Sequence, residues 1–245
     1  MFRHLGCPLH VGLLKADVAS HEKPTGINGP VLITGGGPPP QFQAVPFPRS
    51  KPEMEAAILR GALKFSAGME KPFYSLAGEP VQNKENDLDF QLPTASGTQH
   101  LDLAEIVHSM TRGGYEGAPS KFRVGDMVDN VWGVIQAKEK KYGARRRLVI
   151  HLLLYSVDWK FFLSESCIAL LRLYCQRRKQ HFASIAYYAP ITLDEGILWP
   201  LSPIDSMSLP HIDEASLRNN VVTHGNPAAI EATPDGMGAI LRLDK

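Results

Sequence analysis

The chain has 245 residues, of which 44% are hydrophobic and 21% charged, and this average composition excludes wholesale disorder, a collagen-like chain and a coiled coil. The 26 Lys and Arg residues nearly balance the 25 Asp and Glu residues, so the net charge of +1 gives no sign of a strongly basic nucleic-acid-binding protein. Three cysteines are too few for a disulfide framework, and the longest apolar run, residues 148–157, is too short to cross a membrane. We therefore expect a cytoplasmic protein with no membrane association.

Glycine and proline dominate the chain before residue 50. Residues 24–50 contain three consecutive glycines, three consecutive prolines and a single charged residue, Arg49. Proline removes backbone donors and favours extended conformations, so residues 1–49 are predicted to be a flexible Pro/Gly-rich segment. We assign the folded domain to residues 50–203. The polar, weakly periodic residues 204–245 are interpreted as a tail or a loosely docked appendage.

A helix is predicted to open the folded domain, followed by a hairpin. Ser50 and Glu53 form a capping box, and apolar residues then recur at three- and four-residue spacing as far as Gly68. Short apolar runs predict strands at residues 73–76, 88–92 and 100–107. A turn at Ser96 and Gly97 joins the last two strands into the hairpin.

Helices and strands alternate after the hairpin. A loop rich in glycine and proline, residues 112–119, precedes Ser120, which can cap the next helix. Helices are predicted at residues 123–141 and 163–180, and strands at 148–155, 182–188 and 196–201. This alternation predicts an α/β fold with at least one crossover connection.

Carboxylates on the two strands of the hairpin are the first candidates for chemistry. Asp89 and Asp102 face one another if the turn is tight, and the preceding helix carries Glu55. Magnesium prefers oxygen ligands, and metal-assisted attack on a phosphodiester needs converging carboxylates. The alternative for Asp89 is an exposed strand face, whereas Asp102 lies in an apolar strand where an unpaired carboxylate is costly. Glu105 replaces Asp102 as a ligand if the strand has the opposite orientation.

The order helix, hairpin, helix, strand, together with these acids, resembles the PD-(D/E)xK nuclease superfamily. The resemblance covers about 150 of the 245 residues and implies a restriction-endonuclease-like mixed sheet flanked by helices. It implies that Asp89 and Asp102 are catalytic and bind Mg²⁺, with Glu55 as an additional metal ligand. The implied reaction is hydrolysis of DNA phosphodiesters.

One position departs from the family pattern, because Ala104 occupies the place of the family lysine. That lysine positions the attacking water or stabilises negative charge, which alanine cannot do. Some members of the family supply the group from the following helix, and Lys121 and Lys138 are the nearest candidates here. Two functions remain open at this point: an active nuclease, and a catalytically inactive nuclease-fold domain that binds nucleic acid or a protein partner.

The neutral total conceals a strongly basic middle third. Residues 121–181 carry 13 basic and 5 acidic side chains, a net charge of +8. Six of these cations cluster around a predicted helix end and are candidate nucleic-acid-binding residues, with DNA as the favoured partner: Lys138, Lys140, Lys141, Arg145, Arg146 and Arg147. The alternative is a solvated turn whose cations stabilise the helix C-terminus. A second basic run, residues 177–179, ends the next predicted helix.

Overall fold

The computed structural model describes residues 47–83, 88–107, 121–145, 147–158, 161–204, 212–223, 227–232 and 239–243. The helices are α1 (Lys51–Ala67), α2 (Val124–Tyr142), α3 (Glu165–Arg177) and α4 (Glu214–Asn219). The strands that build the main sheet are β1 (Val81–Gln82), β2 (Phe90–Thr94), β3 (Gly97–Glu105), β5 (Ile150–Tyr155), β6 (Ser184–Pro190) and β7 (Gly196–Ser202). Two short pairs complete the described strands: β4 (Lys121–Arg123) with β8 (Val221–Thr223), and β9 (Pro227–Ala232) with β10 (Ala239–Leu243).

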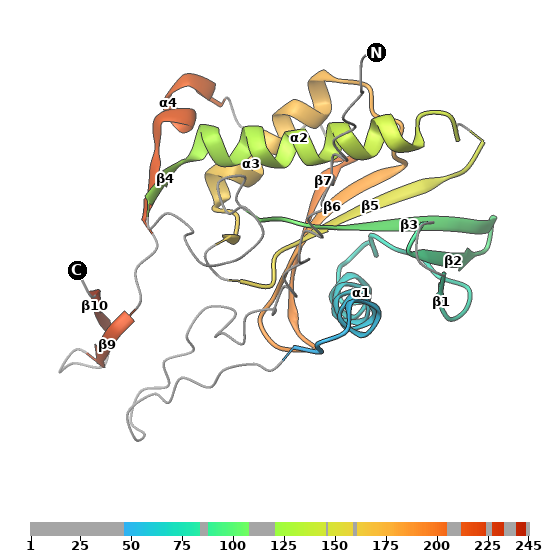
Figure 1. Ribbon diagram of the computed structural model, residues 1–245, viewed down its shortest axis with the longest axis horizontal. Coiled ribbons are helices and arrows are strands. Elements are labelled where there is room, and N and C mark those ends of the chain that lie inside the picture. Colours follow the sequence, from blue (N-terminus) through green and yellow to red (C-terminus); the bar gives the residue numbers. More distant parts are fainter. Residues whose placement is uncertain are drawn as a thin grey trace, which may run out of the picture.

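The main sheet is mixed and six-stranded, in the order β1-β2-β3-β5-β6-β7. Strands β1, β2 and β3 form an antiparallel meander, β3, β5 and β6 run parallel, and β7 returns antiparallel to β6. The two parallel connections pass through α2 and α3, which cover one face of the sheet, while α1 covers the other (Figure 1). The predicted α/β fold with a mixed sheet flanked by helices is thus confirmed, with two crossovers.

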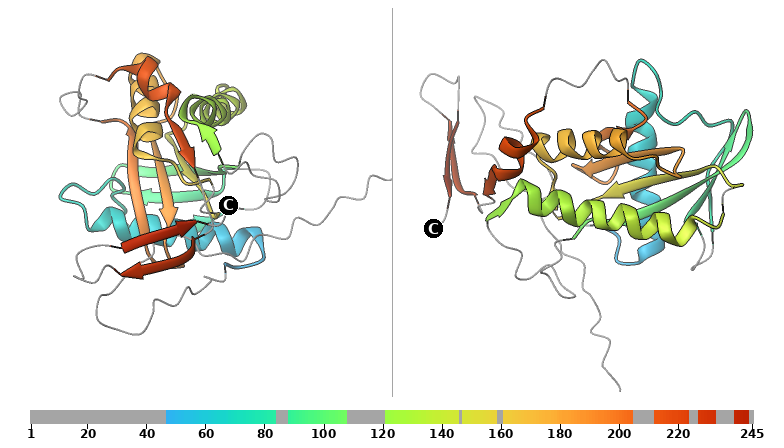
Figure 2. Two further views of the ribbon diagram at one scale, coloured as in Figure 1. Left: turned by 90° about the vertical axis from the view of Figure 1, so that its left-hand side faces the viewer. Right: turned by 90° about the horizontal axis from the view of Figure 1, so that it is seen from above.

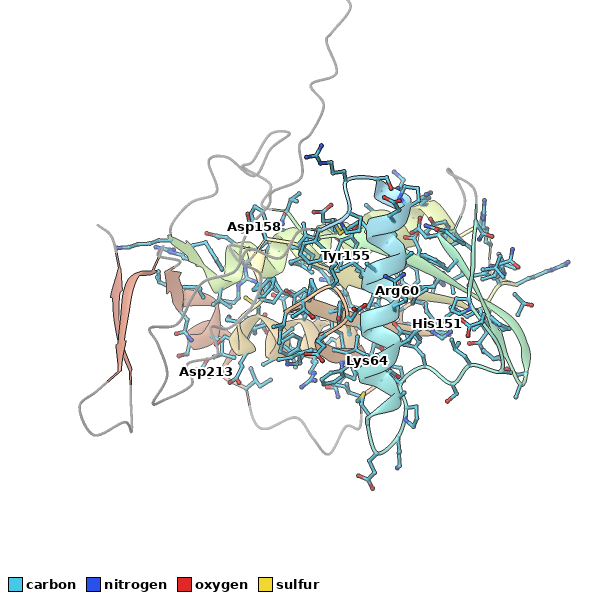
Figure 3. The ribbon with its side chains drawn as sticks, turned by 90° about the horizontal axis from the view of Figure 1, so that it is seen from below. Arg60, Lys64, His151, Tyr155, Asp158 and Asp213 are labelled. Carbon is cyan, nitrogen blue, oxygen red and sulfur yellow. The ribbon has the colours of Figure 1, made fainter. Side chains whose placement is uncertain are left out.

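Alternating side chains of the central strands divide the core into two layers. Leu152 and Leu154 of β5 point into the layer beneath α2 and α3, which lie side by side when viewed from above (Figure 2). Leu153 and Tyr155 point the opposite way, toward α1, which crosses the strands on that face (Figure 3). Because β5 is apolar on both sides, it is buried in the middle of the sheet, as its continuous hydrophobic run predicts.

Local sequence signals set the ends of α1 and the turn of the hairpin. Ser50 is the N-cap of α1: its hydroxyl accepts a hydrogen bond from the Glu53 backbone N–H and donates one to the Glu53 carboxylate at 2.6 Å. At the β2–β3 turn, Gly97 has a φ of +117°, a conformation that residues with a side chain rarely adopt. The Ser50 N-cap and the glycine turn are therefore confirmed, but the Glu53 carboxylate accepts from the Ser50 hydroxyl and not from the Ser50 backbone N–H of a full capping box.

The strand predicted at residues 73–76 is wrong. The Tyr74 backbone N–H donates to the Ser66 hydroxyl at the end of α1, at 2.8 Å, and so has no strand partner. The tyrosine ring packs in the core layer beneath α1. The meander instead begins at β1, two residues long and without a hydrophobic pattern of its own.

Part of the chain beyond residue 203 packs against α2 and α3. Arg218 of α4 pairs with Asp129 of α2 at 2.6 Å and donates to the Tyr174 hydroxyl of α3 at 2.6 Å. Strand β8 pairs with β4 immediately before α2. Among the described residues, no helix is both long and apolar enough to span a membrane.

Candidate functional site

An ammonium group from α2 meets a buried carboxylate of β3. The Lys138 Nζ lies 2.6 Å from Asp102 Oδ2, and the Asp102 side chain is 1% exposed against 24% for Lys138. Asp102 is in β3 and Lys138 is in α2. The two elements are in contact because the chain turns back after β3 and α2 packs on the sheet. A lysine stem can extend along apolar surface to carry its charge this far.

Tyr142, one helical turn after Lys138, provides the second contact to this carboxylate. Its hydroxyl donates to Asp102 Oδ1 at 2.5 Å. Residues four apart lie on the same side of a helix, so Lys138 and Tyr142 together cover Asp102. The spacing of these two residues was visible in the sequence, but the contact was not, because nothing in the sequence shows which strand lies beneath α2.

Asp89 lies where β2 begins and where the pairing of β2 with β3 stops. The last pair along this edge is Phe90 with Leu101. Beyond it, Asp89 Oδ2 accepts a hydrogen bond from the Leu103 backbone N–H at 2.6 Å, and Lys138 donates to the Leu103 carbonyl at 3.2 Å. Two side chains thus satisfy the backbone groups that a neighbouring strand would otherwise pair.

The charges of this cluster act on Asp89. Burial raises the pKa of the Asp89 carboxyl above its usual value, and the negative charge of Asp102 raises it further. The Leu103 N–H, Lys138 and Lys51 oppose this increase. A divalent cation near both aspartates relieves desolvation and mutual repulsion together, so the pair suits a hard cation.

Glu55, the additional ligand implied by the family resemblance, belongs to α1 on the other face of the sheet. It is 6% exposed, and its carboxylate pairs with Lys51 at 3.4 Å. Within the described ranges, no group of three or more His, Cys, Asp or Glu side chains is arranged to hold a metal ion. Asp89 and Asp102, which repel each other electrostatically, form the acidic pair of the candidate site.

The two lysines considered for the vacant family position have different surroundings. Lys121 lies in β4, where it is exposed and opposite Thr223 of β8. Lys138 contacts Asp102 directly, whereas Ala104 packs in the core layer beneath α2. The ammonium beside Asp102 consequently comes from the helix that follows the hairpin.

The predicted nucleic-acid-binding residues separate into two groups. Lys138 is turned inward to Asp102, whereas four others are exposed around the end of α2: Lys140, Lys141, Arg145 and Arg147. Arg146 lies outside the described residues. The ammonium of Lys141 and the guanidinium of Arg145 lie 4.9 and 5.8 Å from the Tyr142 ring centroid.

No protein-family model matches the chain, and no significant match was found among curated proteins or solved structures.

Proposed function

We propose that the protein is a metal-dependent nuclease of the restriction-endonuclease-like fold that hydrolyses DNA phosphodiesters. The observation that carries this proposal is the position of Lys138, whose ammonium lies 2.6 Å from Asp102. In the proposed enzyme, Lys138 has the role of the family lysine that Ala104 replaces. Asp89, beyond the last β2–β3 pair, interacts electrostatically with both Asp102 and Lys138. This is the set of groups that the resemblance to the PD-(D/E)xK superfamily requires.

The order of elements supports the same proposal. Helix α1 precedes the antiparallel β1–β2–β3 meander, and α2 connects β3 to the parallel strand β5. Asp102 lies within β3, as the second acid does in that superfamily. Asp89 immediately precedes β2, whereas the first acid of the superfamily ends a strand before the turn. Strand β6 and its antiparallel partner β7 extend this core.

The roles of the residues follow from their charges. Asp89 and Asp102 would hold Mg²⁺, which when bound supplies an activated water and polarises the phosphoryl oxygens. Lys138 remains beside the carboxylates, where its positive charge stabilises negative charge that develops on the phosphate. Leu103 fixes the arrangement, because its backbone N–H holds Asp89 and its carbonyl accepts from Lys138.

A cleavage assay on single- and double-stranded DNA, with and without Mg²⁺, tests this function. Wild-type protein should cleave only with the metal, and Asp102→Asn and Lys138→Met should each reduce the rate by about 10²-fold or more. Lys71→Met, which removes an exposed lysine after α1 and outside the predicted nucleic-acid-binding residues, serves as the matched control and should retain the rate. Equal background cleavage by the wild type and Asp102→Asn would refute the enzyme.

A second function, a catalytically inactive nuclease-fold domain that binds nucleic acid, is favoured by a different observation. Asp102 is 1% exposed, and both of its oxygens already have partners in Lys138 and Tyr142. A cation that binds Asp102 competes with these contacts, whereas a structural carboxylate keeps both. DNA binding without metal-dependent cleavage in the same assay would support this second function.

A further inference from the structure

A pocket separates the C-terminal ends of α2 and α3. Its volume is about 350 Å³, and its wall includes Arg145 after α2, Lys179 after α3, and His181 just before β6. The two basic runs of the sequence, one after each helix, therefore meet in a single depression. Helices α2 and α3 lie side by side above the sheet, which brings these ends together (Figure 2).

The charge of the pocket is positive. Lys179 is exposed and has no ion-pair partner among the described residues, and Arg145 is also exposed. Glu139 is the acidic residue of the wall, and its carboxylate accepts a hydrogen bond from the His181 backbone N–H at 2.9 Å. The wall of the pocket thus carries two cations and one carboxylate.

A second hollow adjoins this pocket and continues the row of cations. It has a volume of about 580 Å³ and shares Gly143, Arg145 and Leu148 with the first. Arg147 lies on its wall. Arg145 therefore stands between two hollows, with Lys179 in one and Arg147 in the other.

This arrangement fits a chain of phosphates better than a single one. Successive cations in adjoining hollows can contact successive phosphates of one strand, whereas a single phosphate would leave one hollow unused. The aromatic rings of the pocket, Tyr142 and Phe182, are 3% and 7% exposed, so they offer little surface for stacking a base. The contacts available are therefore mainly to the backbone of the strand.

The pocket also adjoins the candidate site. Tyr142 lines the pocket, and its hydroxyl donates to Asp102. Tyr142 is therefore common to the pocket and to the candidate site.

We propose that the adjoining hollows at the ends of α2 and α3 bind consecutive backbone phosphates of a DNA strand, through Lys179, Arg145 and Arg147. This inference rests on the proposed function, since it assigns the path by which the substrate reaches the Asp102 site. It adds Lys179, from the end of α3, to the residues that contact nucleic acid. Binding should be independent of base sequence, because only phosphates are contacted.

The test is fluorescence anisotropy of the full chain with labelled single- and double-stranded oligonucleotides, in EDTA and over a series of salt concentrations. Lys179→Glu and Arg145→Glu should each weaken binding about tenfold or more and reduce the slope of log affinity against log salt by about one. Lys71→Glu makes the same charge change at an exposed position after α1, and it should have a much smaller effect. Thermal melting of each variant establishes that it is folded.

Separate arms identify the source of the phosphate. Inorganic phosphate and a mononucleotide, added as competitors, should displace the oligonucleotide only at concentrations far above that of the unlabelled oligonucleotide. Saturable displacement by inorganic phosphate at a comparable concentration would refute binding of consecutive strand phosphates and would indicate a single-phosphate site. If Lys179→Glu and Lys71→Glu weaken oligonucleotide binding equally, the pocket is not the binding site and the attraction is a general electrostatic one.

The two proposals fail separately. If Lys179→Glu loses DNA binding but the wild type shows no Mg²⁺-dependent cleavage, phosphate binding in the pocket is supported and the nuclease activity is refuted. Cleavage by the wild type, with Lys179→Glu and Arg145→Glu binding and cleaving normally, would retain the enzyme and refute the path. Absence of both binding and cleavage would refute both.

Discussion

The Lys138 ammonium and the Asp102 carboxylate form an ion pair of 2.6 Å between a helix and the strand beneath it. Asp102 is almost fully buried, and its carboxylate is held by this partner and by the Tyr142 hydroxyl. Removal of one member of a buried pair leaves the other charge uncompensated, which costs more than the pair itself contributes. The contact therefore affects stability as well as the proposed catalysis.

Lys138→Met should lower the free energy of unfolding by about 2–4 kcal/mol, because it strands the Asp102 charge in the core. The double variant Asp102→Asn with Lys138→Met should recover most of that loss. Urea denaturation of the single and double variants measures both effects. Lys140→Met, exposed on the same helix, should change stability by no more than about 0.5 kcal/mol. Equal stability of Lys138→Met and Lys140→Met would show that the Lys138–Asp102 pair does not contribute to the free energy of unfolding.

Asp89 allows stability and activity to be separated. Asparagine retains an oxygen that can accept the Leu103 N–H, whereas alanine leaves this backbone donor without its 2.6 Å partner. Asp89→Ala should therefore be less stable than Asp89→Asn by about 1–2 kcal/mol. Both should lose Mg²⁺-dependent cleavage, since neither supplies a carboxylate. Denaturation curves and cleavage rates of the two variants check this, and an active Asp89→Asn would remove Asp89 from the metal site.

His151 should make stability depend on pH. Its Nδ1 lies 2.7 Å from the Ser184 hydroxyl, and its Nε2 lies 2.7 Å from the side-chain amide oxygen of Gln99. Because this amide oxygen only accepts, Nε2 carries the proton and Nδ1 accepts from Ser184. Burial lowers the pKa of His151 from 6.5 to about 4. Between these values the unfolded chain binds a proton that the folded chain does not.

The contribution of His151 is fully present above pH 6.5 and is lost as the pH falls toward 4, by an amount on the order of 3 kcal/mol. Denaturation at a series of pH values should show this loss in the wild type. His151→Gln should reduce the slope in that window, whereas His181→Gln, at an exposed position, should not. Identical slopes for the wild type and His151→Gln would exclude His151 as the cause.

Two helical glycines should respond to alanine with opposite signs. A Cβ at Gly61 of α1 would approach Tyr188 Cζ of β6 to 2.8 Å, and Tyr188 is 1% exposed and unable to move aside freely. A Cβ at Gly133 of α2 would meet nothing within 4 Å. Gly61→Ala should therefore destabilise the protein by about 1–3 kcal/mol through overpacking, despite the better helix propensity of alanine.

Gly133→Ala should instead stabilise the protein by about 0.5–1 kcal/mol, because only the propensity term applies. Thermal melting of the two variants compares them directly. A stabilising Gly61→Ala would mean that α1 does not pack closely on β6.

Local sequence patterns determined most of the elements of this protein. Ser50 and Glu53 fixed the start of α1, Gly97 fixed the hairpin turn, and the apolar run of β5 predicted a strand buried on both faces. These features can be predicted from the sequence because a cap, a turn or a hydrophobic period depends on residues that are close together in the chain. The strand wrongly predicted at residues 73–76 marks the limit, since a side chain of α1, Ser66, takes its backbone N–H.

Only the tertiary structure decided which charged groups meet. The sequence offered Asp89, Asp102 and two lysines without choosing between Lys121 and Lys138, because the choice depends on which part of α2 lies over β3. The packing of α2 on the sheet brings Lys138 and Tyr142 onto Asp102, and the packing of α2 beside α3 brings Arg145 and Lys179 into one pocket. Coulomb energy depends on distance in space and on burial, and neither is encoded in the spacing of residues along the chain.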